Sequence, residues 1–421
     1  MLFKTEWGRS ERGEDFGNRG ETLTSLLNLE GALGFSASNF VTVPHKLFSD
    51  INVDSSSLPE TDHSGFRMVD PLITERYAEK VAPHINEISE LLTGIEGEPI
   101  IVRPSPLDDN LRPDLSFAGA YKGYMPLEEK TREEHILWGT ASMLAGRHTE
   151  YADYYNYRHS IHGRRQTAAI YMQPFFELGK DIPVFYGTGY IAGGHIRNEY
   201  HVLPDPNEQQ RDPKLTVIRN GQVTEGCDDQ SIEKEYDFTP RVSHLLKGLQ
   251  ENFGRSLDVE YIVDPKGDLY VVQMRNISNK HLTNWGRVKD TPEPQTDYRS
   301  AIVNTVGEIS GEVIDLRQDE NDDRLEQSPK GIVVINYESD GVTGTDAADF
   351  LKRITAKDLH SLNVVVDHGR SRLRDHLQYA MVEDPGIDFI VQTHDPEITE
   401  TLVDGERVTI SSDGVILRIA N

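Results

Sequence analysis

Residues 256–278 combine strand-like alternation with charged and amide side chains at regular spacing. Their sequence, SLDVEYIVDPKGDLYVVQMRNIS, alternates apolar and polar residues on both sides of a central turn, which predicts a β-hairpin. In the DPKGD turn, proline presets φ and glycine accepts positive φ. We expect a four-residue loop, Pro265–Asp268, so that Asp264 pairs with Leu269.

This pairing would place four polar side chains on one face of the hairpin. Glu260 would lie opposite Gln273 and Asp258 opposite Arg275, and a slip of one residue would break the match. Carboxylate and amide oxygens suit Mg²⁺, and a planar guanidinium suits phosphate oxygens. The pattern predicts a site for a magnesium-bound polyphosphate. The alternative is a surface hairpin with cross-strand ion pairs.

A second segment, Pro99–Gly119, reads PIIVRPSPLDDNLRPDLSFAG. An apolar run ends in Arg103, and a polar loop leads to Ser-Phe-Ala-Gly. Loop and hairpin together resemble the nucleotide-binding domain of the phosphoenolpyruvate synthase and pyruvate phosphate dikinase family. That family writes V-R-S-S-A-x-x-E-D-L…S-F-A-G and then D-I-E-W…G-x-L-Y-x-L-Q-x-R-P, in the same order.

The resemblance implies an ATP-grasp fold, in which two α+β subdomains hold ATP and Mg²⁺ between them. It implies that Arg103 binds phosphate and that Glu260 and Gln273 position the metal. Arg275 would offset the charge that develops during transfer. It also places Gln173, which ends the apolar strand of AAIYMQP, among the nucleotide-binding residues.

The segment GNRGETLTSLL resembles the family's G-G-K-G-A-N-L at the start of its first helix, with Arg19 where the family has lysine. Backbone amides at a helix start cradle phosphate, and arginine keeps the positive charge. The alternative is a plain turn before a helix. Glycines that follow Gln173 are expected where the backbone approaches another group closely; they are Gly187, Gly189, Gly193 and Gly194. The family's further G-L-G-E stretch is not found.

The C-terminal third resembles the family's swivelling phosphohistidine domain. The matching segments are VGEISGEVI at Val306–Ile314, KGIVVI at Lys330–Ile335, NVVVDHG at Asn363–Gly369 and closing strands at 389–391 and 404–410. The family's phosphate-carrying histidine matches His376, in HGRSRLRDHLQYAMVEDPGID. Here Asp375 replaces the usual Ser or Thr, and the stretch is longer than in the family.

The residues around His376 also favour it as the phosphate carrier. It opens an expected helix, His376–Glu383, and three arginines (Arg370, Arg372 and Arg374) precede it. A helix N-terminus and guanidinium groups stabilise phosphate on an imidazole, which is a competent nucleophile near neutral pH. The alternatives are an ordinary surface helix with a basic first turn, and His368 as the carrier.

Composition narrows the class of protein. The 421 residues contain 70 acidic and 43 basic side chains, for a net charge of −27. This charge opposes binding to nucleic acids and anionic membranes. A single cysteine, Cys227, fits a reducing compartment. There is no apolar run of ~18 residues and the N-terminus is too polar for a signal peptide, so we expect a cytoplasmic protein.

We therefore expect an α+β and α/β multidomain protein, with an ATP-grasp domain at residues 1–285 and a swivelling domain at 296–421. The linker-like KDTPEPQ lies between them. Residues 147–166 hold many tyrosines, histidines and arginines. An amphipathic helix with tyrosines on its buried side is favoured there over a surface that faces an acceptor or partner.

The expected function is an ATP-dependent, dikinase-like phosphotransferase that passes phosphate through His376 to a small-molecule or protein acceptor. The family's barrel for pyruvate and phosphoenolpyruvate is not found, so the acceptor would differ or lie on a separate subunit. The alternatives are a direct ATP-grasp kinase or ligase without phosphohistidine, and a non-catalytic nucleotide-binding regulatory paralogue or subunit of a split synthase.

Overall fold

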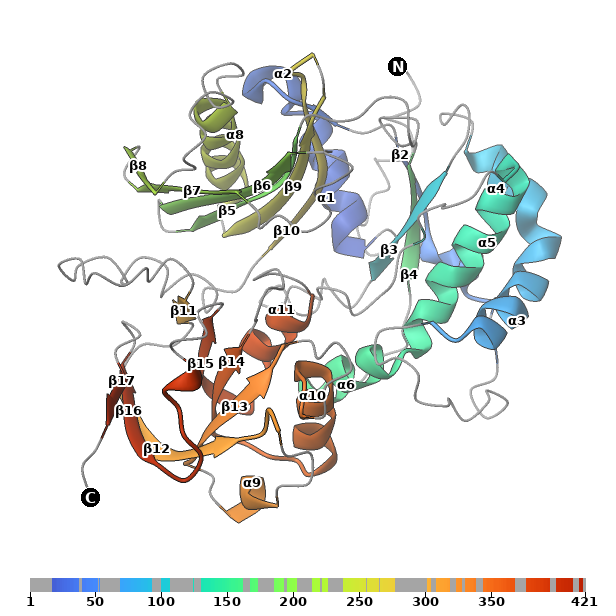
Figure 1. Cartoon of the computed structure of the whole chain (residues 1–421). Coiled ribbons are helices and arrows are strands. Elements are labelled where there is room, and N and C mark those ends of the chain that lie inside the picture. The colour runs from blue at the N-terminus through green and yellow to red at the C-terminus, as the bar shows by residue number, and fades with distance from the viewer. Residues whose placement is uncertain are drawn as a thin grey trace. The chain divides into compact units, whose positions relative to one another are not determined.

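The fold comes from a computed structural model of the whole chain (Figure 1). The structure describes residues 17–37, 40–51, 53, 69–92, 100–106, 124, 130–161, 167–172, 185–192, 195–202, 214–219, 222–225, 238–254, 256–264, 266–276, 301–303, 308–318, 323–327, 330–337, 344–367, 376–393, 399–411 and 416–418. Among these, no helix is long and apolar enough to cross a bilayer.

The chain divides into two compact units. The first comprises Met1–Asp153 and His162–Ile277, and the second comprises Tyr154–Ile161 and Ser278–Asn421. The sequence-based boundary placed residues 154–161 in the first domain, whereas they belong to the second compact unit. The reason is that this short segment makes buried polar contacts with residues of the second unit, described below. The ATP-grasp and swivelling identities of the units stay predictions.

The first unit contains a small antiparallel sheet with the order β2 (Phe40–Val43), β4 (Thr167–Met172) and β3 (Ile101–Pro106). Alternate side chains of a strand face opposite sides. Val102 therefore points into a core that it shares with Ile136 and Met143 of α5 (Arg132–Ala145). Arg103 belongs to the other face of the strand.

The helices beside this sheet have clear start signals. The Asp70 side chain accepts from Leu72 N at the start of α3 (Pro71–Val81). Thr131 and Glu134 form a reciprocal capping box at the start of α5. Such caps satisfy N–H groups that have no partner within the helix. The first unit also contains the short helical segments α2 (Glu30–Leu33), η2 (His45–Phe48), η4 (Ala82–His84), α4 (Ile85–Leu91) and η6 (Gly146–His148).

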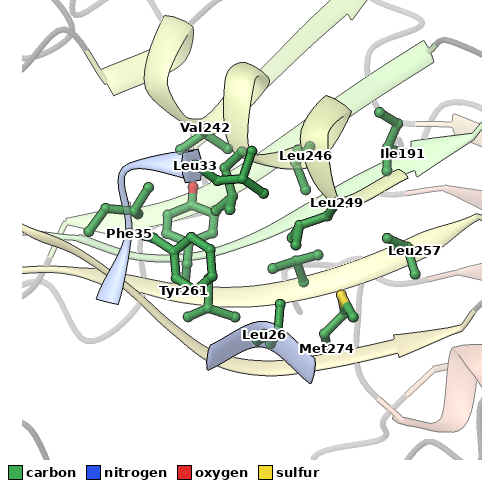
Figure 2. Close-up of a cluster of buried hydrophobic side chains, with 14 of the residues drawn as sticks. Leu26, Leu33, Phe35, Ile191, Val242, Leu246, Leu249, Leu257, Tyr261 and Met274 are labelled. Carbon is green, nitrogen blue, oxygen red and sulfur yellow. The ribbon is translucent and has the colours of Figure 1, made fainter. Parts of the chain in front are cut away.

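The same unit contains a seven-stranded sheet. Its strands, in sheet order, are β1 (Ser36–Ala37), β10 (Leu269–Asn276), β9 (Leu257–Val263), β5 (Phe185–Ala192), β6 (His195–Val202), β7 (Lys214–Arg219) and β8 (Gln222–Glu225). Figure 2 shows Leu246 and Leu249 of α8 (Phe238–Phe253) gathered with Tyr261 and Met274 of the sheet in one hydrophobic core. The core also holds Leu26 of α1 (Gly17–Leu27).

Two of the glycines noted in the sequence leave room for side chains of this core. A Cβ on Gly187 would lie 2.2 Å from the Tyr261 ring, and a Cβ on Gly189 would lie 2.7 Å from a Leu246 methyl group. The close approach at these two positions is therefore made by core side chains. Gly193 and Gly194 lie outside the described residues.

The second unit is built on another seven-stranded sheet, with neighbouring strands β12 to β15 parallel. In sheet order the strands are β11 (Ala301–Val303), β15 (Ile387–Thr393), β14 (Leu362–Asp367), β13 (Ile332–Asn336), β12 (Glu308–Asp315), β16 (Arg407–Ser411) and β17 (Ile416–Arg418). Its helices are α9 (Arg324–Gln327), α10 (Ala347–Ala356) and α11 (His376–Glu383). The strands expected from the C-terminal sequence are all found.

The tyrosine-rich segment forms α6 (Glu150–Arg158). Tyr151, Tyr154 and Tyr155 are buried, which confirms the amphipathic interpretation, while Tyr157 is 57% exposed. Within the second unit, Arg158 Nη2 donates to Asp384 Oδ1 at 2.6 Å, and Tyr154 also donates to Asp384. These contacts place residues 154–161 in the second unit.

Candidate functional site

The hairpin of β9 and β10 has a tighter turn than the sequence suggested. Asp264 N donates to Asp268 O at 3.0 Å, so three residues separate the two, and Leu269 pairs with Val263. The expected four-residue loop and the pairing of Asp264 with Leu269 are therefore wrong. Gly267, with φ 83°, takes the left-handed position that a three-residue hairpin loop requires.

A bulge further along the hairpin corrects the register. The pairing shifts between Val271 and Gln273, which leaves Val272 as the extra residue. Beyond it Gln273 pairs with Glu260 and Arg275 pairs with Asp258, as expected. The tighter turn moves the register by one residue, and the bulge restores it.

The two faces of this hairpin differ in character. Leu257, Tyr261 and Met274 point into the core with α8 (Figure 2). Val259 belongs to the same core. Because side chains alternate along a strand, the four polar residues lie on the opposite face. The core side fixes which face the polar residues occupy.

Arg103 connects the small sheet to this polar face. Its Nη1 donates to Gln273 Oε1 at 2.5 Å and lies 3.5 Å from Glu260 Oε2. The side chains of Arg103 and Glu260 are 23% and 14% exposed. The structure thus brings together three residues that the sequence singled out from two distant segments.

Arg275 makes a tighter ion pair two residues further along the hairpin. Its Nε donates to Asp258 Oδ2 at 2.6 Å, and the side chains are 9% and 0% exposed. A carboxylate bonded to Nε in a buried environment fixes the plane of the guanidinium. Arg275 is thereby held on the same sheet face as Glu260 and Gln273.

Arg19 lies in the first turn of α1 and is buried. The next residue, Gly20, donates its backbone N–H to Ser105 Oγ at 3.0 Å. Ser105 is two residues beyond Arg103, so both belong to the same face of β3. Its hydroxyl therefore ties the start of α1 to the strand that carries Arg103.

Ser105 was not recognised from the sequence. The available signal was a small hydroxyl residue between two prolines, in phase with Arg103 along an expected strand. Its acceptor role depends on a helix 85 residues away in sequence, which local pattern does not reveal.

Glu260 and Gln273 suit Mg²⁺ in kind, because both offer hard oxygen atoms that point toward the same guanidinium. Among the described residues no group of three or more His, Cys, Asp or Glu side chains is arranged to hold a metal ion. The two oxygens fit a cation that is held mainly by the phosphates of a nucleotide, which is how Mg²⁺ is usually bound in such sites.

Helix α11 begins at His376 and ends at Glu383, as the sequence predicted. Nothing is described for the His376 side chain, so its role as a carrier stays a prediction. The remaining predicted site residues lie outside the described part of the chain; they are Gln173, His368, Arg370, Arg372 and Arg374.

Comparison with known proteins adds little to this geometry. No protein-family model matches the chain, and no curated protein matches it. Among solved structures, the chain is similar to D-cycloserine synthetase DcsG, with a TM-score of 0.25, 12% identity, and 60% of this chain and 61% of that chain covered.

It is also similar to macrocyclase MdnC bound with precursor peptide MdnA from Microcystis aeruginosa MRC, with a TM-score of 0.23 and 8% identity over 65% of this chain and 54% of that chain. A third similar structure is the ADP complex of purK, N5-carboxyaminoimidazole ribonucleotide synthetase. It has a TM-score of 0.23 and 12% identity, with 63% of this chain and 49% of that chain covered. The matches thus span about half to three fifths of those proteins' lengths. Such low TM-scores do not establish a shared fold, so the resemblance to the dikinase family stays a prediction from the sequence motifs.

Proposed function

We propose that the first unit binds ATP with Mg²⁺ where Arg103 meets the polar face of the hairpin. The observation that supports this is the contact of one guanidinium with a carboxylate and an amide oxygen from a different sheet. Arg103 would bind phosphate oxygens, and Glu260 and Gln273 would hold the metal. Guanidinium and hard oxygen ligands are the groups that a metal-bound polyphosphate needs.

Three further residues extend the proposed site. Arg275, fixed by Asp258, would offset negative charge that develops during transfer. Arg19 sits in the first turn of α1, where backbone N–H groups and the helix dipole favour phosphate. Gln173 directly follows β4 in the sequence and would contact the nucleotide from there.

The proposed chemistry is the transfer of a phosphoryl group from ATP directly to a bound acceptor, as in a kinase or a ligase. Phosphoryl transfer needs positioning and electrostatic stabilisation more than covalent help. When bound, Mg²⁺ would neutralise charge on the phosphates. All the residues proposed for the nucleotide belong to the first unit, so this reading requires no residue from the second unit.

A second candidate, transfer through His376, is favoured by one observation. Helix α11 begins at this residue, and a phosphate on the imidazole would be stabilised by a helix N-terminus. The acceptor would be a small molecule, a protein or a separate subunit, as in the direct reading.

Labelled ATP distinguishes the candidates. The chain would be incubated with Mg²⁺ and ATP labelled at the β- or the γ-position, with and without candidate acceptors, and then assayed for acid-labile phosphohistidine. Direct transfer to the acceptor predicts that the wild type carries no acid-labile label and that His376→Ala still consumes ATP. A label that His376→Ala abolishes supports the carrier instead. Nucleotide binding without any consumption of ATP would support a non-catalytic sensor.

A further inference from the structure

In the free protein, the cation and the anion of the proposed nucleotide site bind each other. Arg103 Nη1 lies 2.5 Å from Gln273 Oε1 and 3.5 Å from Glu260 Oε2. The same two oxygens were assigned above to the metal, and the same guanidinium to phosphate. The metal therefore has to displace Arg103 from Glu260 and Gln273, and phosphate has to displace these two oxygens from Arg103.

Either ligand alone would break the Arg103–Glu260 contact and bring like charges together. Mg²⁺ alone would draw Glu260 and Gln273 away from Arg103 and leave a guanidinium beside a divalent cation. A free polyphosphate would draw Arg103 away and leave the Glu260 carboxylate beside phosphate. Both side chains are largely shielded from water, at 23% and 14% exposed, so like charges brought together there repel strongly.

We propose that Arg103 and Glu260 form an exchangeable pair that couples the binding of metal and polyphosphate. The inference rests on the proposed function and defines its ligand as a metal-complexed polyphosphate. When both components arrive, Glu260 and Gln273 exchange Arg103 for the metal, and Arg103 exchanges them for phosphate. Every charge then keeps a partner. Couplings between two ligands of one protein are roughly 5–150-fold, which is the size expected here.

The neighbouring charges explain why this pair exchanges. Asp258 and Arg275 are joined at 2.6 Å, with side chains 0% and 9% exposed. Arg103 and Glu260 are farther apart and more exposed. Electrostatic attraction falls with distance and with access of water. The Arg103–Glu260 contact is therefore the one that opens at lower cost, while Asp258 keeps Arg275 in place.

The test is calorimetric titration of the full chain with three probes: MgCl₂ alone, ATP with a chelator, and ATP with excess MgCl₂. In the wild type, Mg²⁺ should tighten ATP binding by about 5–150-fold, and MgCl₂ alone should bind weakly. Arg103→Gln should tighten the binding of MgCl₂ alone, because Glu260 loses its guanidinium partner. Glu260→Gln should tighten ATP in chelator and weaken ATP in MgCl₂.

Asp404→Asn is a control, because it removes one carboxylate of an ion pair in the second unit and should leave all three affinities unchanged. Equal ATP affinity with and without Mg²⁺ in the wild type would overturn the exchange while leaving nucleotide binding intact. Unchanged MgCl₂ affinity in a folded Arg103→Gln protein would also overturn it. Failure of the wild type to bind ATP under any condition would instead reject the proposed function.

Discussion

Gln273 stands directly opposite Glu260 across β10 and β9 because Val272 bulges out of the ladder just before it. The turn alone would place the strands one residue out of the expected register. The bulge and the tight turn together align two oxygen atoms that accept from the Arg103 guanidinium.

Gly187→Ala should destabilise the first unit. The added Cβ would lie 2.2 Å from the Tyr261 ring, which is fully buried. Overpacking of this kind costs typically about 1–3 kcal/mol. Urea denaturation would measure the change in the free energy of unfolding. Gly31→Ala is the matched control, since nothing lies within 4 Å of its Cβ position. Equal stability of both variants would contradict the packing.

Asp384→Ala should be strongly destabilising. Asp384 is fully buried and accepts from Arg158 Nη2 at 2.6 Å and from Nε at 2.9 Å. Removing one partner of a buried ion pair costs about 3–5 kcal/mol. Asp404→Ala breaks a pair of similar length, 2.7 Å, but with side chains 32% and 49% exposed. It should cost less than about 1 kcal/mol in the same thermal or urea unfolding experiment. Similar losses in the two variants would contradict the assignment of residues 154–161 to the second unit.

Stability should fall in acid partly through Asp404. The Arg324 guanidinium holds the pKa of this carboxyl below its ordinary value. A depressed folded-state pKa means that the stabilisation is present above the unfolded pKa, about 3.9, and is lost as pH falls through the folded pKa. In Asp404→Asn, the urea midpoint should therefore drop less steeply below about pH 4. An unaltered slope would show that the pair contributes nothing.

Ser105→Ala should loosen the start of α1 and weaken ATP binding. Its hydroxyl accepts from Gly20 N at 3.0 Å, and the side chain is fully buried. Loss of a helix-cap acceptor costs about 0.5–2 kcal/mol. Calorimetry well below the unfolding temperature separates the two effects: a purely structural role lowers the melting temperature and leaves the dissociation constant unchanged. Ser105→Thr, which keeps the hydroxyl, should retain more of the affinity.

Local patterns predicted much of this molecule. Alternation of apolar and polar residues identified the hairpin. The pairing of Glu260 with Gln273 was expected from a four-residue loop, and it holds because the bulge at Val272 offsets the shorter turn. The start of α11 at His376 also followed from local sequence. The strands β12 to β16 were expected from the family resemblance of the C-terminal segments.

Other features depend on contacts that are distant in sequence. The bulge at Val272 reflects competition between turn geometry and core packing, which neither strand shows by itself. The close approaches at Gly187 and Gly189 required the positions of Tyr261 and Leu246. Arg158 meets Asp384 across 226 residues of chain. No local pattern indicates that residues 154–161 belong to the second unit.

Calorimetric titration of Mg·ATP into the wild type and Arg103→Ala is the most direct test of the proposed site. The wild type should bind Mg·ATP. The variant should bind more weakly by about 2–3 kcal/mol, the loss expected when a charge-assisted contact is removed from a partly buried site. Circular dichroism would verify that the variant is folded. Equal affinity in the two proteins, or no binding to the wild type, would contradict the assignment of Arg103, Glu260 and Gln273 to a nucleotide site.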